Sequence, residues 1–537
     1  MRGRMSMYSP RDLLLAKGLS DAAVTAILQP YGFVDCRRAD ANLQAIADEP
    51  LARQHLAEIV EAMLDCVGES ADPDQALDYL ERFAKASANK IALLSHLRAS
   101  PATLRLLATV FGSSPFLSQI LIRNPEYLYS ISGPDILERI RPRRELEQDL
   151  AASLRSLRSK ERQLNALRRF KRRELLAIGV RDLLREATVE ETTASLSGLA
   201  QVLIQHSYTV CRTALRRRYG DSRNGFSVIA LGKLGGGELN FSSDVDVIYL
   251  CGSDTGTTMG TKTEGKTSRL SHELYFRKLA QDLTNAMTEV TNEGYLFRVD
   301  LRLRPEGKAG RLVESLQGYR RYYRGTRGQA WERLVQIKAW PIAGDKALGK
   351  RFLEMVQPFV YQKARAREVF QDVKRMKGLI NKKLERRGEA QRNVKLGTGG
   401  IREIEFVVQA LQAAFGGKMT AIRERNTVKA LGKLLRARLI SADEHGVLVE
   451  SYWFLRDVEH KLQMVEEQQT HTLPADPTEL RKVALRLGYR DTEETVASEL
   501  FLRDHARHTE RVHDIFTRLV SEGQRIGMTR RVQGDVC

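Results

Sequence analysis

Cysteine is scarce in this chain of 537 residues, and long apolar runs are missing from it. The five cysteines stand far apart, at Cys36, Cys66, Cys211, Cys251 and Cys537. They form no C-x-x-C pair or cysteine–histidine spacing that would indicate zinc, and an odd, scattered set fits a reducing compartment. No run approaches the roughly 20 apolar residues of a membrane-spanning helix, and the first residues lack the apolar segment of a signal peptide. We therefore expect a soluble, cytoplasmic protein without a membrane partner.

Acidic residues are outnumbered by basic ones, 67 against 86, which gives a formal net charge of +19. This balance favours an acidic partner, such as a nucleic acid, a nucleotide or an acidic protein surface. The excess is spread along the chain, however. Its densest part, Arg139 to Arg173, is interrupted by glutamates and leucines at helical spacing, which is typical of a solvated helix face. Charge alone therefore does not predict nucleic-acid binding.

The most informative segment is a glycine-rich turn that leads into two aspartates, Gly232-Lys-Leu-Gly-Gly-Gly-Glu-Leu-Asn-Phe-Ser-Ser-Asp-Val-Asp-Val-Ile-Tyr-Leu250. Residues i and i+2 of a strand face the same side, so Asp244 and Asp246 project together, with Cα atoms roughly 7 Å apart. The three consecutive glycines let the preceding backbone approach a phosphate closely. Metal-binding carboxylates beside a phosphate cradle are what phosphoryl or nucleotidyl transfer requires.

An ordinary structural interpretation of this pattern stands beside the chemical one. A D-x-D pair can lie on a solvated strand face, and a glycine cluster can be a plain turn. The chain holds such a case in Asp72-Pro73-Asp74, where the proline marks a loop and no glycine turn precedes. We interpret that pair as structural.

A second segment favours chemistry at Asp244 and Asp246. Residues 295–304, Tyr-Leu-Phe-Arg-Val-Asp-Leu-Arg-Leu-Arg, alternate strictly between apolar and polar and predict a strand that the next residue, a proline, ends. Asp300 supplies a third carboxylate. Arg302 and Arg304 share its face and can hold phosphate oxygens in forked geometry. Alone, this segment would indicate an edge strand with a salt-bridged outer face; together with the glycine turn it predicts an active site.

The strands are expected only between about residues 225 and 345, and the rest of the chain is predicted to be helical. Ser114 is expected to cap a helix that Pro115 begins. A glycine-to-helix junction at Gly400 and Ile401 could offer free N–H groups to an anion, or could be plain capping. Leu455, with the apolar residues spaced three and four apart after it, indicates a buried helical seam.

These motifs together resemble known families. A glycine turn, a D-x-D pair and an aspartate on a later strand look like the nucleotidyltransferase fold of the DNA polymerase β type. Further segments, in the same order, are similar to the glutamine synthetase adenylyltransferase family, which makes the resemblance specific over about residues 111–475. The segments are 111–116, 168–176, 232–246, 299–307, 329–333, 337–339 and 399–406.

The resemblance implies an α+β, mostly helical fold with a polymerase-β-type core, a small mixed sheet with helices. It implies an N-terminal helical region (1–140), a nucleotidyltransferase domain (141–392, with its core at about 225–345) and a C-terminal helical bundle (393–537). Family members usually carry two catalytic modules in tandem, one that removes AMP from a tyrosine of glutamine synthetase and one that adds it. This chain has one copy, and the sequences of its motifs are closer to those of the N-terminal, adenylyl-removing module.

The resemblance also implies a mechanism. Asp244, Asp246 and Asp300 would be catalytic and would hold Mg²⁺ or Mn²⁺. Phosphate would attack the AMP phosphorus, the tyrosyl oxygen would leave, and ADP would form, as part of nitrogen-assimilation control. The residues expected to contact nucleotide phosphates or the attacking phosphate are Gly235, Gly236, Ser243, Arg302 and Arg304. Supporting roles are expected for Arg402, Glu403 and Glu405.

Glutamine synthetase would be the protein substrate, with ATP, ADP and phosphate as substrates or products and a PII signal protein as a regulator. Other functions stay open at this point. The module could instead adenylylate glutamine synthetase with ATP, or transfer a nucleotide to RNA or a small molecule, although the ordered motifs argue against a nucleic-acid partner. It could also be a non-catalytic module that docks on glutamine synthetase or PII; the presence of all three carboxylates argues against that.

Overall fold

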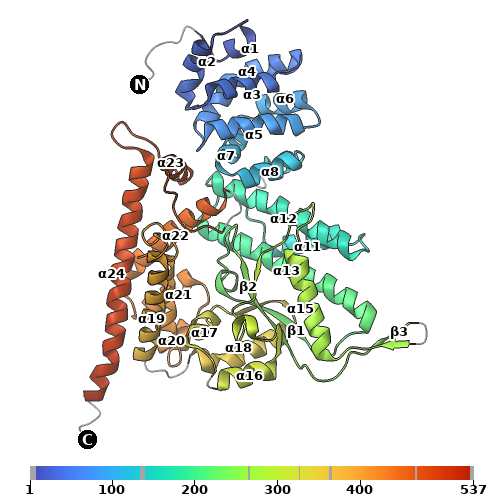
Figure 1. Ribbon diagram of the computed structural model, residues 1–537, viewed down its shortest axis with the longest axis vertical. Coiled ribbons are helices and arrows are strands. Elements are labelled where there is room, and N and C mark those ends of the chain that lie inside the picture. The colour runs from blue at the N-terminus through green and yellow to red at the C-terminus, as the bar shows by residue number, and fades with distance from the viewer. Residues whose placement is uncertain are drawn as a thin grey trace.

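The computed structural model describes residues 8–133, 139–263, 266–325, 327–361, 366–465 and 469–532. Figure 1 shows an N-terminal group of helices at one end, a small sheet with its helices in the middle, and a C-terminal helical group beside the sheet. The fold is α+β and mostly helical, as predicted. The predicted domain limits at 140 and 392 stay a prediction, although every strand falls between residues 226 and 344.

Helices fill the chain before the sheet. They are α1 (Asp12–Leu15), α2 (Asp21–Leu28), η1 (Gln29–Tyr31), α3 (Cys36–Ile46), α4 (Pro50–Gly68), α5 (Pro73–Ala86), α6 (Lys90–Ala99), α7 (Pro101–Ser113), α8 (Pro115–Arg123), α9 (Tyr127–Ile131), α11 (Arg143–Leu154), α12 (Lys160–Leu183) and α13 (Val189–Tyr219).

Several of these helices begin with a capping residue followed by proline, because a proline at the first helical position needs no N–H partner. Ser114 accepts a hydrogen bond from the Leu117 N–H at 3.2 Å, as predicted. Asp72 caps α5 in the same way, and Asp74 accepts from two backbone N–H groups of the loop before α3. The structural interpretation of Asp72-Pro73-Asp74 is thus confirmed, at a helix start rather than in a loop.

The sheet and its helices follow. They are β1 (Phe226–Ala230), α14 (Gly232–Gly236), β2 (Val245–Cys251), β3 (Thr261–Thr263), β4 (Lys266–Ser268), α15 (His272–Thr288), β5 (Val299–Asp300), η2 (Gly307–Ala309), β6 (Val313–Ser315), α16 (Leu316–Arg324), α17 (Ala330–Gln336), β7 (Trp340–Gly344) and α18 (Lys346–Val360). The main sheet has the order β5-β2-β1-β7, and β6 also pairs with β2. β1 is antiparallel to β2 and β7, whereas β5 and β6 run parallel to β2.

Helices again make up the C-terminal part. They are α19 (Ala366–Glu385), α20 (Ile401–Phe415), η3 (Thr420–Ile422), α21 (Thr427–Arg436), α22 (Ala442–Gln463), α23 (Pro477–Arg486) and α24 (Ala497–Val532). Leu455, Val458 and Leu462 of α22 are buried, as their spacing predicted, whereas Val465, the last position of the predicted seam, lies beyond the helix and is half-buried. The long α24 runs along the outer edge of this group (Figure 1).

Two apolar cores lie on opposite faces of the sheet. Alternate residues of the central strands divide between them, because side chains alternate across a strand. Val228, Val247 and Tyr249 join a core shared with the N-terminal helices, whereas Ile229 and Ile248 join a core shared with the C-terminal helices. By the same alternation, the even-numbered residues of β2, Asp246 among them, face the C-terminal helices.

The predicted strand over 295–304 is wrong in its extent, because pairing is limited to Val299 and Asp300. The chain then turns: the backbone N–H of Arg302 donates to Asp300 Oδ1 at 2.8 Å, and a side-chain hydrogen bond of this kind competes with a strand ladder. The alternation of the following residues therefore does not place them on one strand face.

The prediction of a solvated basic face over Arg139–Arg173 is wrong at two positions. Arg168 is 1% exposed and donates to the backbone oxygens of Ala286 and Glu289. Lys171 is 6% exposed and lies over an aromatic ring. Both long side chains bury their stems where α12 packs against the segment that follows α15.

The four described cysteines carry free thiols, and Cys537 lies outside the described residues. Among the described helices, none combines the length and the apolar character that a bilayer crossing requires.

Candidate active site

Strand pairing brings the three predicted carboxylates to one side of the sheet. Asp246 and Asp300 are direct Cα partners in the parallel pairing of β2 with β5. Asp244 lies two residues before Asp246, on the same side, and the Val245 N–H between them donates to the Arg298 carbonyl at 2.9 Å. The site thus stands at the β5 edge of the sheet, on the face toward the C-terminal helices.

Arginines hold two of these carboxylates. Arg298 donates from Nε to Asp244 Oδ1 at 2.8 Å, and also to the Tyr295 hydroxyl at 3.1 Å and to the Ser242 carbonyl. Arg302 donates from Nε to Asp300 Oδ2 at 2.8 Å. The carboxylates of Asp244 and Asp300 are therefore oriented by guanidinium groups, which are their partners in this conformation.

The other predicted arginine has a different role. Arg304 donates to the backbone carbonyls of Leu301 at 2.7 Å, Lys308 at 3.0 Å and Gly310 at 3.1 Å. These bonds stabilise the turn after β5. Its contact with phosphate, like that of Arg302, stays a prediction that needs the side chain to change partners.

Asp246 has the most perturbed carboxyl of the three. Burial raises its pKa to about 6, and the neighbouring charges of Asp300 and Asp244 add to the rise. The positive charges of Lys395 and Arg402 act in the opposite direction, which places both near this carboxyl. A carboxylate that is destabilised by burial and like charge gains from a nearby cation.

The donor chemistry fits a hard divalent cation, because carboxylate oxygens are its usual ligands. In the described residues, no three His, Cys, Asp or Glu side chains are gathered closely enough to hold one. Asp244 is paired with Arg298, and Asp300 with Arg302. Metal binding by these residues stays a prediction, and it requires Asp300 to exchange its arginine for the ion.

The glycine turn forms a one-turn helix, α14, whose first residue faces the site. Gly232 has φ +52°, and a Cβ added there would stand 2.3 Å from Asp246 Oδ2, so only glycine fits. Gly235 is close-packed as well: a Cβ there would stand 2.1 Å from the Lys338 carbonyl oxygen. The predicted phosphate residues Gly235 and Gly236 thus have a packing reason to be glycine. Their contact with phosphate, and that of the half-buried Ser243, stays a prediction.

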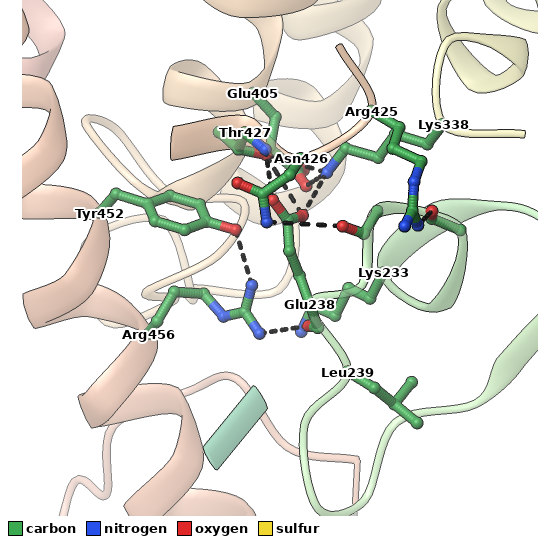
Figure 2. Close-up of polar contacts among 12 residues, drawn as sticks. Lys233, Glu238, Leu239, Lys338, Glu405, Arg425, Asn426, Thr427, Tyr452 and Arg456 are labelled. Carbon is green, nitrogen blue, oxygen red and sulfur yellow. Dashed lines mark hydrogen bonds and ion pairs between the residues drawn. The ribbon is translucent and has the colours of Figure 1, made fainter. Parts of the chain in front are cut away.

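A buried ionic cluster attaches this turn to the C-terminal helices (Figure 2). Lys338 donates to Glu238 at 2.8 Å, to Glu405 of α20 at 2.9 Å and to the Thr427 hydroxyl of α21 at 3.1 Å. Arg425 donates to the Gly235 carbonyl at 2.5 Å. We call Glu238, Lys338, Glu405 and Thr427 the turn clamp.

The charges of the turn clamp stabilise one another. Burial lowers the pKa of Lys338, but Glu238 and Glu405 outweigh it, so the net shift is upward. Burial raises the pKa of Glu405, but Lys338 and Arg402 outweigh it, so the net shift is downward. All four side chains are nearly inaccessible to water, so these ion pairs lie in a low-dielectric setting.

A second buried cluster lies on the other side of the turn, around Glu459 of α22. Glu459 accepts from Lys233 at 2.7 Å and Asn240 at 2.6 Å, and His471 lies 2.9 Å from it. Arg456 of the same helix donates to the Glu238 carbonyl at 2.5 Å (Figure 2). Residues on both ends of the glycine turn are thus tied to one helix of the C-terminal group.

The three supporting residues predicted on α20 separate in the structure. Glu405 belongs to the turn clamp, and Arg402 lies 3.4 Å from it. Glu403 is fully buried and pairs with Lys377 at 2.9 Å, away from the turn clamp. The anion site considered at the start of α20 is not open, because the N–H groups of Ile401 and Arg402 donate to the carbonyls of residues 394 and 395. Plain capping is the correct interpretation there.

Sequence reasoning missed the clamp residues outside α20 and the polar face of α22. Glu238 and Lys338 stand inside segments that carried the family resemblance, which was the available signal. On α22 the apolar spacing predicted only the buried seam. Arg456 and Glu459 directly follow residues of that seam and are buried as well.

Two sequence families match the chain. The model of the family described as glutamate-ammonia ligase adenylyltransferase matches residues 104–355, and that described as GlnD PII-uridylyltransferase matches residues 374–520.

Curated relatives carry the name bifunctional glutamine synthetase adenylyltransferase/adenylyl-removing enzyme. The relative from Pseudomonas putida is 37% identical over 390 residues, 71% of this chain and 39% of its own length. That from Nitrosococcus oceani is 35% identical over 424 residues, 78% of this chain and 42% of its own. That from Thioalkalivibrio sulfidiphilus is 33% identical over 467 residues, 86% of this chain and 46% of its own length. The chain thus spans less than half the length of the relatives it matches.

Proposed function

This chain belongs, through residues 104–355, to the glutamate-ammonia ligase adenylyltransferase family, and from that premise we propose that it is a metal-dependent nucleotidyltransferase that acts on glutamine synthetase. The reaction we propose is phosphorolytic removal of AMP from the adenylylated tyrosine, with ADP as the product. The observation that supports the proposal is the position of Asp244, Asp246 and Asp300 on one side of the sheet, with Gly232 against Asp246.

The proposed direction rests on the sequence. The name of these relatives includes both an adenylyltransferase and an adenylyl-removing activity. This chain has one glycine turn with D-x-D, and the sequences of residues 240–244 and 402–406 are closer to those of the removing module. The match of residues 374–520 to a PII-uridylyltransferase family supports a PII signal protein as the regulator.

In the proposed reaction, a phosphate oxygen forms a bond to the AMP phosphorus, the bond to the tyrosyl oxygen breaks, and the tyrosine takes up a proton. A divalent cation held by Asp244, Asp246 and Asp300 would neutralise the charge on the transferred group. Asp246 must be deprotonated to bind it, which its pKa of about 6 allows at neutral pH. With Asp300 as a ligand of that cation, Arg302 would be free to donate to the attacking phosphate.

The other cations of the site have supporting positions. Lys395 and Arg402 act electrostatically on Asp246 from the loop before α20 and from its first turn. Within the described residues, the Lys395 ammonium has no carboxylate at ion-pair distance, so it is available to the phosphates of the nucleotide. The turn clamp and the Glu459 cluster keep the glycine turn in place while these groups exchange partners.

The test uses purified adenylylated and unmodified glutamine synthetase. Each is incubated with the chain and Mg²⁺ or Mn²⁺, the first with phosphate and the second with ATP, and the AMP-tyrosine is followed by intact mass, with and without a PII protein. We expect phosphate-dependent loss of AMP with release of ADP. The Asp246→Asn variant should be inactive, and Asp443→Asn, on an exposed position of α22, should be fully active.

The alternatives predict other results. ATP-dependent gain of AMP would mean that the chain is the adding module. No change with either substrate, in the presence of PII, would refute nucleotidyl transfer on glutamine synthetase and would favour the RNA or docking functions. Retention on RNA with a steep salt dependence would support the first of these.

A further inference from the structure

A cavity of about 350 Å³ lies away from the carboxylates, where α8 and α12 meet the turn that precedes β5. Three segments that are far apart in the sequence line it, and we call it the α8–α12 cavity. Its walls include Phe116, Gln119, Arg123, Lys171, Arg172 and Tyr295. None of these residues belongs to the turn clamp or to the predicted site.

The chemistry of the cavity is apolar in its body and cationic around it. Phe116, Leu175 and the ring of Tyr295 supply apolar surface. Lys171 lies 4.7 Å from the centre of the Tyr295 ring, and its ammonium also has a backbone partner. Pockets of this kind, with apolar walls and a few convergent polar groups, are typical of small-molecule sites.

Among the residues that the structure describes, cationic side chains outnumber carboxylates around the cavity. The one described carboxylate that lines it, that of Glu293, is already paired with Arg169 at 3.0 Å and with Arg172 at 3.3 Å. Arg123 is exposed at the edge and, within the described part of the chain, has no carboxylate at ion-pair distance. An anionic group on a ligand would meet Arg123 without displacing an existing ion pair.

One wall of the cavity is joined to the candidate active site. The Tyr295 hydroxyl accepts from Arg298 at 3.1 Å, and the same guanidinium donates to Asp244 at 2.8 Å. The backbone between them is fixed by hydrogen bonds from the N–H groups of residues 296 and 297 to the Met287 carbonyl. A ligand that moves the Tyr295 ring therefore moves the arginine that orients Asp244.

We propose that the α8–α12 cavity is a binding site for a small organic anion with an apolar or aromatic body, and that its occupancy reaches Asp244 through Tyr295 and Arg298. The body of the ligand lies against Phe116 and Tyr295, and its anionic group pairs with Arg123. The site is distinct from the nucleotide site and gives the fold a place where a metabolite can act on the carboxylates.

Binding is tested first, with 8-anilinonaphthalene-1-sulfonate, an aromatic sulfonate whose fluorescence rises in apolar surroundings. We expect saturable binding to one site of the full chain. Arg123→Glu and Gln119→Trp, which reverse the charge and fill the cavity, should each weaken binding at least about tenfold. Arg386→Glu, which reverses an exposed charge elsewhere, should leave it unchanged. Absence of saturable binding, or equal binding by all variants, would overturn the site.

Coupling is tested by hydrogen exchange, which needs neither metal nor activity and so fails separately from the proposed function. With the probe bound, we expect slower exchange in peptides covering 295–300 and 240–247. Tyr295→Phe removes the hydroxyl that meets Arg298; it should still bind the probe and protect 295–300, but no longer protect 240–247. Unchanged exchange at 240–247 in the wild-type chain would refute the coupling.

Discussion

Replacing Lys338 by methionine should destabilise the C-terminal half of the protein strongly. Lys338 is 4% exposed, and its ammonium donates to Glu238, Glu405 and the Thr427 hydroxyl at 2.8–3.1 Å. Methionine keeps most of the volume and the apolar stem. It removes the one charge that lies between two buried carboxylates.

The expected loss follows from what is left behind. Breaking a buried ion pair by removing one partner costs about 3–5 kcal/mol of the free energy of unfolding, because the other charge stays buried. Two carboxylates are affected here, but Glu238 keeps its bonds from Thr427, and Glu405 keeps Arg402 at 3.4 Å. We therefore expect a loss within that range rather than twice as large.

The loss should depend on pH with a definite sign. In the wild-type protein the pKa of Glu405 is lowered, so its ionised form contributes stability that is present above the ordinary carboxyl pKa and is lost as the pH falls. Without Lys338, the burial that raises the pKa of Glu405 loses its largest opposing influence, and protonation of this carboxyl relieves the variant. The difference in stability between wild type and variant should therefore shrink as the pH falls from 7 toward 5.

The assay is urea unfolding followed by tryptophan fluorescence. All three tryptophans, Trp331, Trp340 and Trp453, lie in the C-terminal half of the chain, whose helices the turn clamp attaches to the glycine turn. Lys350→Met is the matched control, because that lysine is 78% exposed and its pair with Glu354 is 3.9 Å long; it should change the stability by less than about 0.5 kcal/mol.

Two results would refute the reasoning. The first is a loss of less than about 1 kcal/mol in Lys338→Met, which would mean that the cluster does not hold the turn. The second concerns the double variant. Lys338→Met combined with Glu405→Gln should lose less free energy of unfolding than the sum of the two single losses, since the neutral glutamine removes one of the unpaired charges. A loss equal to the sum would refute the reasoning.

The remaining predictions concern the carboxylates. Asp246→Asn should abolish transfer yet raise the metal-free stability at pH 7 by about 1–3 kcal/mol in calorimetry, because a pKa raised from 3.8 to about 6 means that the wild type loses stability as the pH rises between those two values; an unchanged melting temperature would contradict it. For the same reason, Mn²⁺ affinity measured by electron paramagnetic resonance should rise between pH 5 and 6 and level off above, and a flat profile would argue against Asp246 as a ligand. Gly232→Ala should weaken Mn²⁺ binding at least about tenfold, since its Cβ would stand 2.3 Å from Asp246 Oδ2; wild-type affinity would refute that contact. Arg298→Met should free Asp244 from its partner and lower the transfer rate more than the substrate affinity, whereas an unchanged rate would show that Arg298 does not position the carboxylate.

Local patterns predicted part of the candidate site well. β1 and β2 were recognisable because both faces of these strands are covered, which makes them continuous apolar runs. The D-x-D spacing placed Asp244 and Asp246 on one side, since the two-residue period of a strand is a property of the backbone alone. The alternation of residues 295–304 predicted too long a strand. Such a pattern shows which faces the side chains of a strand would take, but not whether a neighbouring strand is there to pair with. Beyond Asp300, a turn closed by the Arg302 N–H takes the place of strand pairing.

The sequence by itself determined the chemistry available to this protein: three carboxylates, a glycine-rich turn before two of them, and the motifs that mark the family. Which groups meet was decided only by the tertiary structure. Glu238 and Lys338 are 100 residues apart, and Lys233 and Glu459 are 226 apart. A periodic pattern within one segment of the sequence cannot predict such pairings. They exist because the C-terminal helices cover the same face of the sheet that carries Asp246, where a buried charge is stable only beside an opposite one.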